Sequence, residues 1–265
     1  MKRIGSKTVE GTRLVWPDRV PFEARYTETG RNDACVTGVF LYGSGKMQVA
    51  WSLEGAVLSE CPFDRRGLRH GLELSRYEDG AVEWQVRWLR GVMHGSAQQF
   101  DEDGHVLYRS RFNQGTGIDL WVQGSEIVEL RELEDNERHG LERWGHPRLP
   151  YEEAFYLRGR RAGVFRRWAG VDLEAGYPKF FVDDEEVSKN EYLRARRERA
   201  ELPAYVPAEN GRARPMLRVF KSIWLRKDVR AALVRTPSVD DAIGCGAHRR
   251  DPESAEDPEG PEPMK

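Results

Sequence analysis

The chain has 265 residues, of which 39% are hydrophobic and 32% are charged. That mix suits a thin, surface-rich protein better than a globule with one large core. The 42 basic and 44 acidic residues nearly cancel, so no overall field favours a nucleic-acid partner, and we expect none. The three cysteines, Cys35, Cys61 and Cys245, lack CxxC or CxxH spacing, which argues against a disulfide framework and a zinc site.

The N-terminal segment, residues 1–21, opens with basic residues that no apolar run follows. We therefore expect no secretory signal there. No stretch of the chain approaches the ~20 apolar residues that a membrane span requires. Together with the scattered cysteines, this predicts a cytoplasmic protein in a reducing compartment.

Glycines and aromatic residues recur at intervals of about 24 residues between positions 22 and 182. A pattern that repeats at this period is typical of repeat architectures, in which each unit stacks on its neighbours. The pattern is clearest over 67–115 and 136–168. The glycines that mark the units are Gly67, Gly71, Gly80, Gly91, Gly95, Gly104, Gly115, Gly140 and Gly163.

Within a unit the hydrophobic period is two, which indicates strands with one buried and one wet face. In 82–88, valines and tryptophans alternate with Glu83, Gln85 and Arg87. In 106–112, the same alternation places Leu107 on the wet face. Glycines at the ends supply tight turns. The predicted fold is therefore mainly β: an elongated antiparallel sheet of tandem β-hairpins.

These residues resemble the variant form of the MORN repeat. The resemblance is carried by Gly-x-x-x-Gly followed by alternating aromatic residues and glycines, and it is best over 67–115. Such repeats are widespread in bacteria, and their members are frequently labelled antitoxin-like. The resemblance implies a partner, such as a toxin or another effector, whose active surface the sheet would block.

The end of the array, residues 183–205, is predicted to be a capping helix region. Lys179–Val182 has the pattern of a last strand, and a turn at 183–184 is expected to lead into a helix near 188–201. Ser188 and Glu191 have the spacing of a capping box. A helix here would cover the open edge of the last hairpin.

Residues 206–240 form a basic segment, and 241–265 are acidic and proline-rich, which predicts disorder. The stretch 216–235 is a candidate basic helix with Ile223 and Trp224 on one side. It could lie on anionic lipid, bind nucleic acid or pack on the protein itself, and we favour packing. The lipid-binding residues would be Arg218, Lys221, Trp224, Arg226, Lys227 and Arg230.

Three histidines, His70, His94 and His139, precede glycines in what we expect to be equivalent turns. Neighbouring copies would sit two strands apart, roughly 10 Å, which is too far to share one zinc ion. We interpret them as turn residues. The cysteines and serines lie in no nucleophile motif. We therefore expect no enzyme activity, catalytic residue, metal or cofactor.

Two side-chain sets are candidates for binding. The wet face carries Glu83, Arg87, Arg109 and Arg111, which would either recognise a partner or keep the sheet soluble. The other set is a tryptophan ladder on one sheet face, which we interpret as core in preference to a binding stripe. It would consist of Trp84, Trp88, Trp121, Trp144 and Trp168. The sequence thus predicts a non-catalytic protein-binding scaffold; the alternative is a membrane-associated scaffold that uses residues 212–235.

Overall fold

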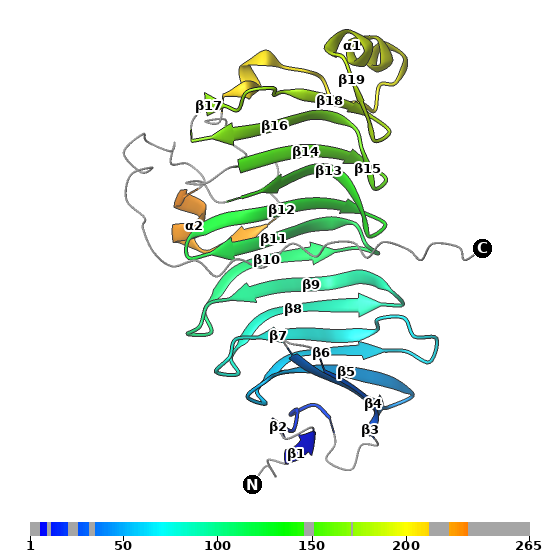
Figure 1. Cartoon of the computed structure of the whole chain (residues 1–265), viewed down its shortest axis with the longest axis vertical. Helices are drawn as coiled ribbons and strands as arrows, with labels where there is room; N and C mark the ends of the chain where they lie inside the picture. The colour runs from blue at the N-terminus through cyan, green and yellow to red at the C-terminus, as the bar shows by residue number, and fades with distance from the viewer. Residues whose placement is uncertain are drawn as a thin grey trace, which may run out of the picture.

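The computed structural model describes residues 6–9, 12–20, 26–31, 35–145, 151–170, 172–211 and 223–232. As predicted, the fold is mainly β. Consecutive strands form hairpins that build two large antiparallel sheets along the long axis of the molecule (Figure 1). The helices in the described ranges are α1 (Lys189–Glu198), the 3-10 helix η1 (Pro207–Asn210) and α2 (Lys227–Ala232).

In the described residues, the first sheet has nine strands in the order β20-β10-β9-β8-β7-β6-β5-β4-β3. These are β3 (Tyr26–Arg31), β4 (Cys35–Tyr42), β5 (Gly45–Ser52), β6 (Val57–Phe63), β7 (Gly71–Arg76), β8 (Val82–Leu89), β9 (Val92–Phe100), β10 (Val106–Phe112) and β20 (Trp224–Leu225). A separate hairpin of β1 (Ser6–Val9) and β2 (Thr12–Val15) precedes it, in a segment where the sequence predicted no strand.

The second sheet follows the order β11-β12-β13-β14-β16-β18-β19, with β15 beside β14 and β17 beside β16. Its strands are β11 (Gly117–Gln123), β12 (Glu126–Glu134), β13 (Glu137–Trp144), β14 (Tyr151–Leu157), β15 (Arg160–Arg161), β16 (Gly163–Ala169), β17 (Asp172–Leu173), β18 (Lys179–Val182) and β19 (Glu185–Val187).

The repeat glycines serve the turns and strand starts as predicted, since all nine have positive φ. Gly115 shows why the residue is needed. Its φ is +81°, and a Cβ there would lie 2.4 Å from the backbone nitrogen of Asn136 in the next turn. Only glycine combines that backbone conformation with so close an approach.

The buried face of the first sheet changes side along the sheet. On β4 and β5 the core residues include Val36, Phe40 and Val49. On β8 to β10 the core is on the opposite face, and it consists of Val86, Trp88, Ala97 and Phe112, joined by Leu133 of β12. The predicted alternation is confirmed in β8, where Val86 and Trp88 are buried and Arg87 is exposed.

A row of cross-strand partners makes this change of side visible. Directly opposite residues of an antiparallel sheet share a face. One unbroken row crosses from β5 to β20 through Val49, Glu60, Leu74, Gln85, Gln98, Arg109 and Trp224. It begins at a fully buried valine and ends at Trp224, which is 51% exposed.

The N-terminal segment covers only part of this row, and its extent determines which residues of the row are buried. Leu14 and Val20 pack on the β4–β5 part of that face. Arg19 extends the cover, because its Nε donates to Glu60 Oε1 at 3.2 Å and its Nη1 donates to the carbonyl of Leu72. Glu60 also receives Arg76 Nη2 at 2.8 Å. The cover ends at this buried ion cluster.

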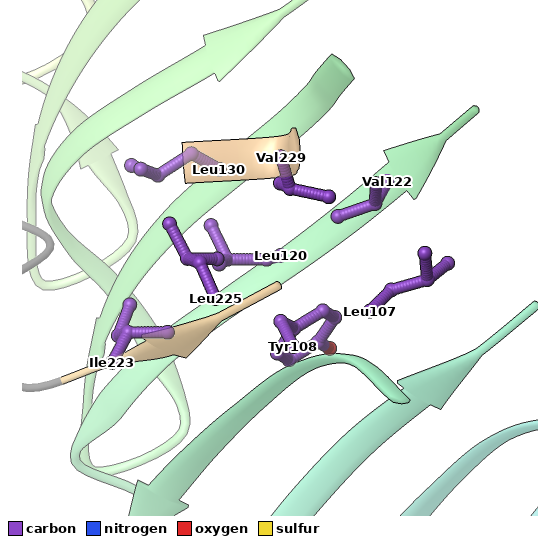
Figure 2. Close-up of a cluster of buried hydrophobic side chains, with 8 residues drawn as sticks. All are labelled: Leu107, Tyr108, Leu120, Val122, Leu130, Ile223, Leu225 and Val229. Atoms are coloured by element: carbon purple, nitrogen blue, oxygen red, sulfur yellow. The ribbon is translucent and has the colours of Figure 1, made fainter. Parts of the chain in front are cut away.

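The seam between the two sheets is closed by the C-terminal segment 223–232. β20 pairs with β10, and α2 lies against β12. Figure 2 shows Ile223, Leu225 and Val229 directed toward side chains of β10, β11 and β12. All three are buried, which confirms packing on the protein's own body for these residues. The full cluster is Leu107, Tyr108, Leu120, Val122, Leu130, Ile223, Leu225 and Val229.

Two predictions about this region were wrong. Leu107 is 3% exposed, because a register shift between Val106 and Tyr108 breaks the alternation and segment 223–232 covers the site. The single basic helix is also corrected within the described residues. Ile223 and Trp224 lie in or beside a strand, so they point to opposite sides, one buried and one exposed. Residues 212–222 and 233–265, including the expected acidic disordered tail, lie outside the described residues.

The end of the array largely follows the prediction. β18 has the predicted bounds, and the turn residues Asp183 and Asp184 have positive φ. Helix α1 has the predicted capping box of Ser188 and Glu191. The sequence missed β19, which pairs with β18 before the helix begins. Helix α1 packs on β18 through the buried Tyr192, whose ring lies 5.4 Å from that of Phe180.

The tryptophans do not form one ladder on one face. Trp88 and Trp168 are buried, whereas Trp144 is 54% exposed. The register pairs Trp144 with Glu152 and Glu152 with Arg167, so Trp168, the next residue along, lies on the opposite face from Trp144. A change of one residue in repeat spacing reverses the face of every side chain in a strand.

Candidate protein-binding surface

The exposed end of the cross-strand row forms a cationic surface on β8, β10 and β20. Arg109 is opposite Gln98 on one side and Trp224 on the other. Arg111 is opposite Ser96, two positions along the same face. Arg87 adds a third guanidinium from β8. All three arginines are exposed, and we call the set Arg87, Arg109, Arg111 and Trp224 the arginine–tryptophan surface.

The three arginines of this surface form no ion pair with any residue in the described ranges. The guanidinium of Arg109 lies 5.6 Å from the ring centroid of Trp224, a cation–π arrangement. By contrast, the second sheet pairs Arg166 with Glu153 at 3.1 Å and Arg167 with Glu174 at 2.7 Å. The surface therefore carries positive charge that its described neighbours do not neutralise.

Glu83 does not join this surface. The register passes from Ser75 opposite Trp84 to Arg76 opposite Val82, so Glu83 is the extra residue of a β-bulge. It lines a cavity of about 530 Å³ near the seam, with Tyr77 and Gln99 among the other lining residues. Its carboxylate accepts from Ser75 Oγ at 3.3 Å, and burial raises its pKa. The structure thus separates Glu83 from the three arginines.

The residues of the lipid-binding alternative have different surroundings. Arg226 Nε donates to Asp228 Oδ1 at 2.8 Å, and its Nη1 pairs with Asp101. These carboxylates raise the pKa of Arg226. Lys227 and Arg230 are exposed on α2, and Arg230 donates to the Ile223 carbonyl at 3.3 Å. Arg218 and Lys221 lie outside the described residues.

The interpretation of the recurring histidines as turn residues is wrong for two of them, because His94 lies near the start of β9 and His139 near the start of β13. His70 directly precedes β7, and two of the three side chains contact a neighbouring turn. His70 Nδ1 accepts the backbone N–H of Arg90 at 3.4 Å, and His94 Nδ1 accepts that of Gln114 at 3.1 Å. At the corresponding place in the next unit, Thr116 Oγ1 accepts the N–H of Asp135 at 3.4 Å. The Thr116 hydroxyl thus accepts the backbone hydrogen bond that the imidazole accepts in the other two units.

Backbone hydrogen bonds join the same turns into a ladder. The Gly91 N–H donates to the Arg69 carbonyl at 2.9 Å, and the Gly115 N–H donates to the Met93 carbonyl at 2.7 Å. Gly159 and Asp184 repeat this contact farther along the chain. His139 differs from the other two histidines, because its Nδ1 lies 2.9 Å from Glu134 Oε2.

One group of side chains has the composition of a cation site. Ligand atoms of Asp101, Asp103 and His105 lie within 4.8 Å of one another, a proximity that the sequence analysis missed. Asp101 is already engaged, since its Oδ1 accepts the N–H of His105 at 2.8 Å and its Oδ2 pairs with Arg226. These contacts account for the cluster as a hairpin turn tied to the C-terminal segment.

A half-buried acid in β11 also went unnoticed in the sequence. Asp119 faces Arg131 across β11 and β12, yet burial raises its pKa to about 6. Glu129 raises it further, while Arg131 lowers it. An isolated acid between apolar residues of a strand gives no local signal of such burial.

Comparisons with known proteins add no family. No family model matches the sequence, and no curated protein matches it. Among solved structures, one similar chain comes from a crystal structure of accessory secretory protein 1, 2 and 3 in Streptococcus pneumoniae. The match has a TM-score of 0.26 and 16% identity, and it covers 39% of this chain and 19% of that one. Within the described residues, no helix is both long and apolar enough to cross a membrane.

Proposed function

We propose that the chain is a non-catalytic, protein-binding repeat scaffold that recognises an acidic surface of its partner through Arg87, Arg109, Arg111 and Trp224. The observation that carries this proposal is the concentration of three exposed arginines, without described ion pairs, beside a half-exposed tryptophan. Arginine and tryptophan are the side chains that most often dominate protein interfaces. The strands fix the backbone from which these side chains project, so little backbone conformational entropy is lost on binding.

The resemblance to variant MORN repeats extends the proposal to the kind of partner. We propose an antitoxin- or immunity-like role in the bacterial cytoplasm, in which the sheet covers the active surface of a toxin or another effector. An acidic active surface would complement the arginines and increase the rate of encounter.

The membrane-scaffold alternative draws less support from the described residues. An interfacial helix needs an apolar face that is free to enter the lipid. Ile223, Leu225 and Val229 instead fill the seam between the sheets. Trp224 is the exposed aromatic residue of this segment, and it lies on the arginine–tryptophan surface.

Affinity capture from the native host's lysate tests the proposal, with mass spectrometry to identify bound proteins. Three versions of the full chain are compared: wild type, Arg87→Gln with Arg111→Gln, and Arg158→Gln with Arg160→Gln. The last is a matched control, because both residues are exposed arginines without described ion pairs, in the β14–β15 hairpin of the second sheet. We expect one protein to be retained by wild type and control and lost by the first variant.

Two results would count against the proposal. Equal retention by all three versions would show that the partner binds elsewhere. Replacement of a defined protein by membrane vesicles, lost at high salt, would favour the lipid alternative instead.

A further inference from the structure

The arginine–tryptophan surface begins where the N-terminal cover ends, and it is a sheet face without a described cover. Along the cross-strand row, Leu74 is 6% exposed, and Arg109 and Trp224 are exposed. An occupant of this surface must bring negative charge, because three guanidinium groups face it without described acidic partners. It must also offer a group that packs on the ring of Trp224.

The chain contains a segment with that chemistry. Residues 251–262 read DPESAEDPEGPE and hold six carboxylates, three prolines and no basic side chain. Proline rings pack well on aromatic side chains, and prolines reduce the conformational freedom that binding removes. The segment carries a net charge of −6 and no base, and it complements three exposed arginines that have no described ion pair beside a half-exposed tryptophan.

The distance along the chain permits contact. The described structure reaches Ala232 at the end of α2, eight positions after Trp224. Residues 233–250 then connect α2 to the acidic segment. A connection of 18 residues has a root-mean-square span of roughly 20–25 Å and a maximum of about 60 Å. The arginine–tryptophan surface therefore lies within its reach.

Tethering makes even a weak contact effective. A short connection gives its two ends an effective concentration on the order of 1 mM. A segment that binds with a dissociation constant below about 1 mM as a free peptide would therefore occupy the surface most of the time when attached.

We propose that residues 251–262 bind to Arg87, Arg109, Arg111 and Trp224 and occupy this surface until a more acidic or better-fitting partner displaces them. This inference rests on the proposed function only in using the same surface. It makes the acidic segment an internal competitor, which raises the affinity that a partner needs.

The test uses a fluorescein-labelled synthetic peptide of residues 251–263 and measures its fluorescence anisotropy with full-length chains. In the acceptor chain the six acids of the segment are neutralised at full length. The substitutions are Asp251→Asn, Glu253→Gln, Glu256→Gln, Asp257→Asn, Glu259→Gln and Glu262→Gln. We expect this acceptor to bind the peptide at least fivefold more tightly than wild type, because its own segment no longer competes.

The acceptor is then combined with the two arginine pairs. We expect Arg87→Gln with Arg111→Gln to weaken peptide binding about tenfold, and Arg158→Gln with Arg160→Gln to leave it within twofold. Raising the salt from 50 to 300 mM should weaken binding to the acceptor, since the contact is between exposed charges. Circular dichroism melts verify that each variant is folded.

Three outcomes would overturn the inference: no binding of the peptide to the acceptor, equal weakening by both arginine pairs, or equal binding by acceptor and wild type. None of these measurements involves the external partner. Loss of partner capture with normal peptide binding would thus refute the proposed function alone, and the reverse would refute only the internal contact.

Discussion

Val49 and Arg109 lie on the same face of one sheet, joined by an unbroken row of cross-strand partners, yet Val49 is 0% exposed and Arg109 lies in solvent. The two residues differ in exposure because another segment covers the sheet face at Val49 and no described segment covers it at Arg109. The N-terminal segment covers the row as far as Glu60, and the core of the later strands forms on the other side. A binding surface is thus made from a face that is hydrophobic core a few strands away.

Substitutions at two neighbouring residues of β20 should have different effects, one on protein stability and the other on partner binding. Leu225 is 4% exposed in the seam cluster, so Leu225→Ala should lower the free energy of unfolding by about 2–4 kcal/mol. Trp224→Ala, at an exposed position, should change it by less than about 1 kcal/mol while weakening partner capture. Urea unfolding followed by circular dichroism measures both. Equal destabilisation by the two changes would contradict the described burial.

Truncations from the C-terminus should show that segment 223–232 stabilises the protein by covering the seam. A chain ending at Gly211 keeps η1 but lacks β20 and α2, which would expose Leu107, Leu120 and Leu130 at the seam. A chain ending at Thr236 keeps both elements. We expect the shorter chain to bind 1-anilinonaphthalene-8-sulfonate strongly and to melt well below the full chain, because apolar surface becomes exposed. The longer truncation should resemble the full chain in both measurements.

Adjacent arginines on β16, one buried and one half-exposed, offer a test of how burial changes the contribution of an ion pair to stability. Arg166 is 4% exposed and contacts Glu153, Glu209 and Asn210, whereas Arg167 is 37% exposed beside Glu152 and Glu174. Arg166→Gln should cost about 1–3 kcal/mol of unfolding free energy, because the buried Glu153 loses one of its two guanidinium partners and keeps only Arg143. Arg167→Gln should cost at most about 1 kcal/mol. Similar melting temperatures for the two variants would refute this difference.

Asp119 should make stability fall as pH rises. Its pKa is raised from 3.8 to about 6 in the folded chain, so between these values the folded state binds more protons than the unfolded state. Stability therefore falls as pH rises from about 4 to about 6, by on the order of 2–3 kcal/mol at 1.36 kcal/mol per pKa unit, and stays at the lower value above pH 6. Asp119→Asn removes this cost. We expect the variant to be more stable than wild type at pH 7.5.

The difference should vanish below about pH 4, where both states of wild type are protonated. Melting curves at pH 4 and pH 7.5 measure it. A less stable Asp119→Asn variant at pH 7.5 would mean that the carboxylate's attraction to Arg131 outweighs its burial.

The turn ladder predicts which replacement for a histidine is tolerated. Thr116 accepts a turn N–H where His70 and His94 do so in their own units. His94→Thr should therefore retain the contact to Gln114, whereas His94→Val should lose about 0.5–1 kcal/mol of unfolding free energy. Chemical denaturation distinguishes the two, since equal stabilities would show that this contact contributes nothing.

Local patterns predicted the local structure well. Alternation around Val86 and Trp88 predicted a strand, the repeat glycines predicted turns, and Ser188 with Glu191 predicted a helix start, because each signal acts over a few residues. Glu83 and Leu107 were misplaced because bulges change the face of a side chain without changing the composition of its strand.

The sequence analysis did not predict the contacts between residues far apart in the chain. Arg109 is next to Trp224 only because β20 returns to β10, and Arg19 reaches Glu60 across 41 positions. Those contacts decide which face is covered, and no periodicity encodes them. The candidate surface could therefore be predicted as a set of arginines, but its tryptophan and its boundary could not.

The late return of segment 223–232 has a consequence for the newly made chain. Ser125 and Asp228, whose side chains are 2.7 Å apart at the seam, are 103 positions apart in sequence. At roughly 5–20 residues per second, translation leaves the middle of the protein without its closing segment for about 5–20 seconds. Throughout that interval, Leu107, Leu120 and Leu130 are a target for chaperones and for the same leucines of neighbouring nascent chains on a polysome.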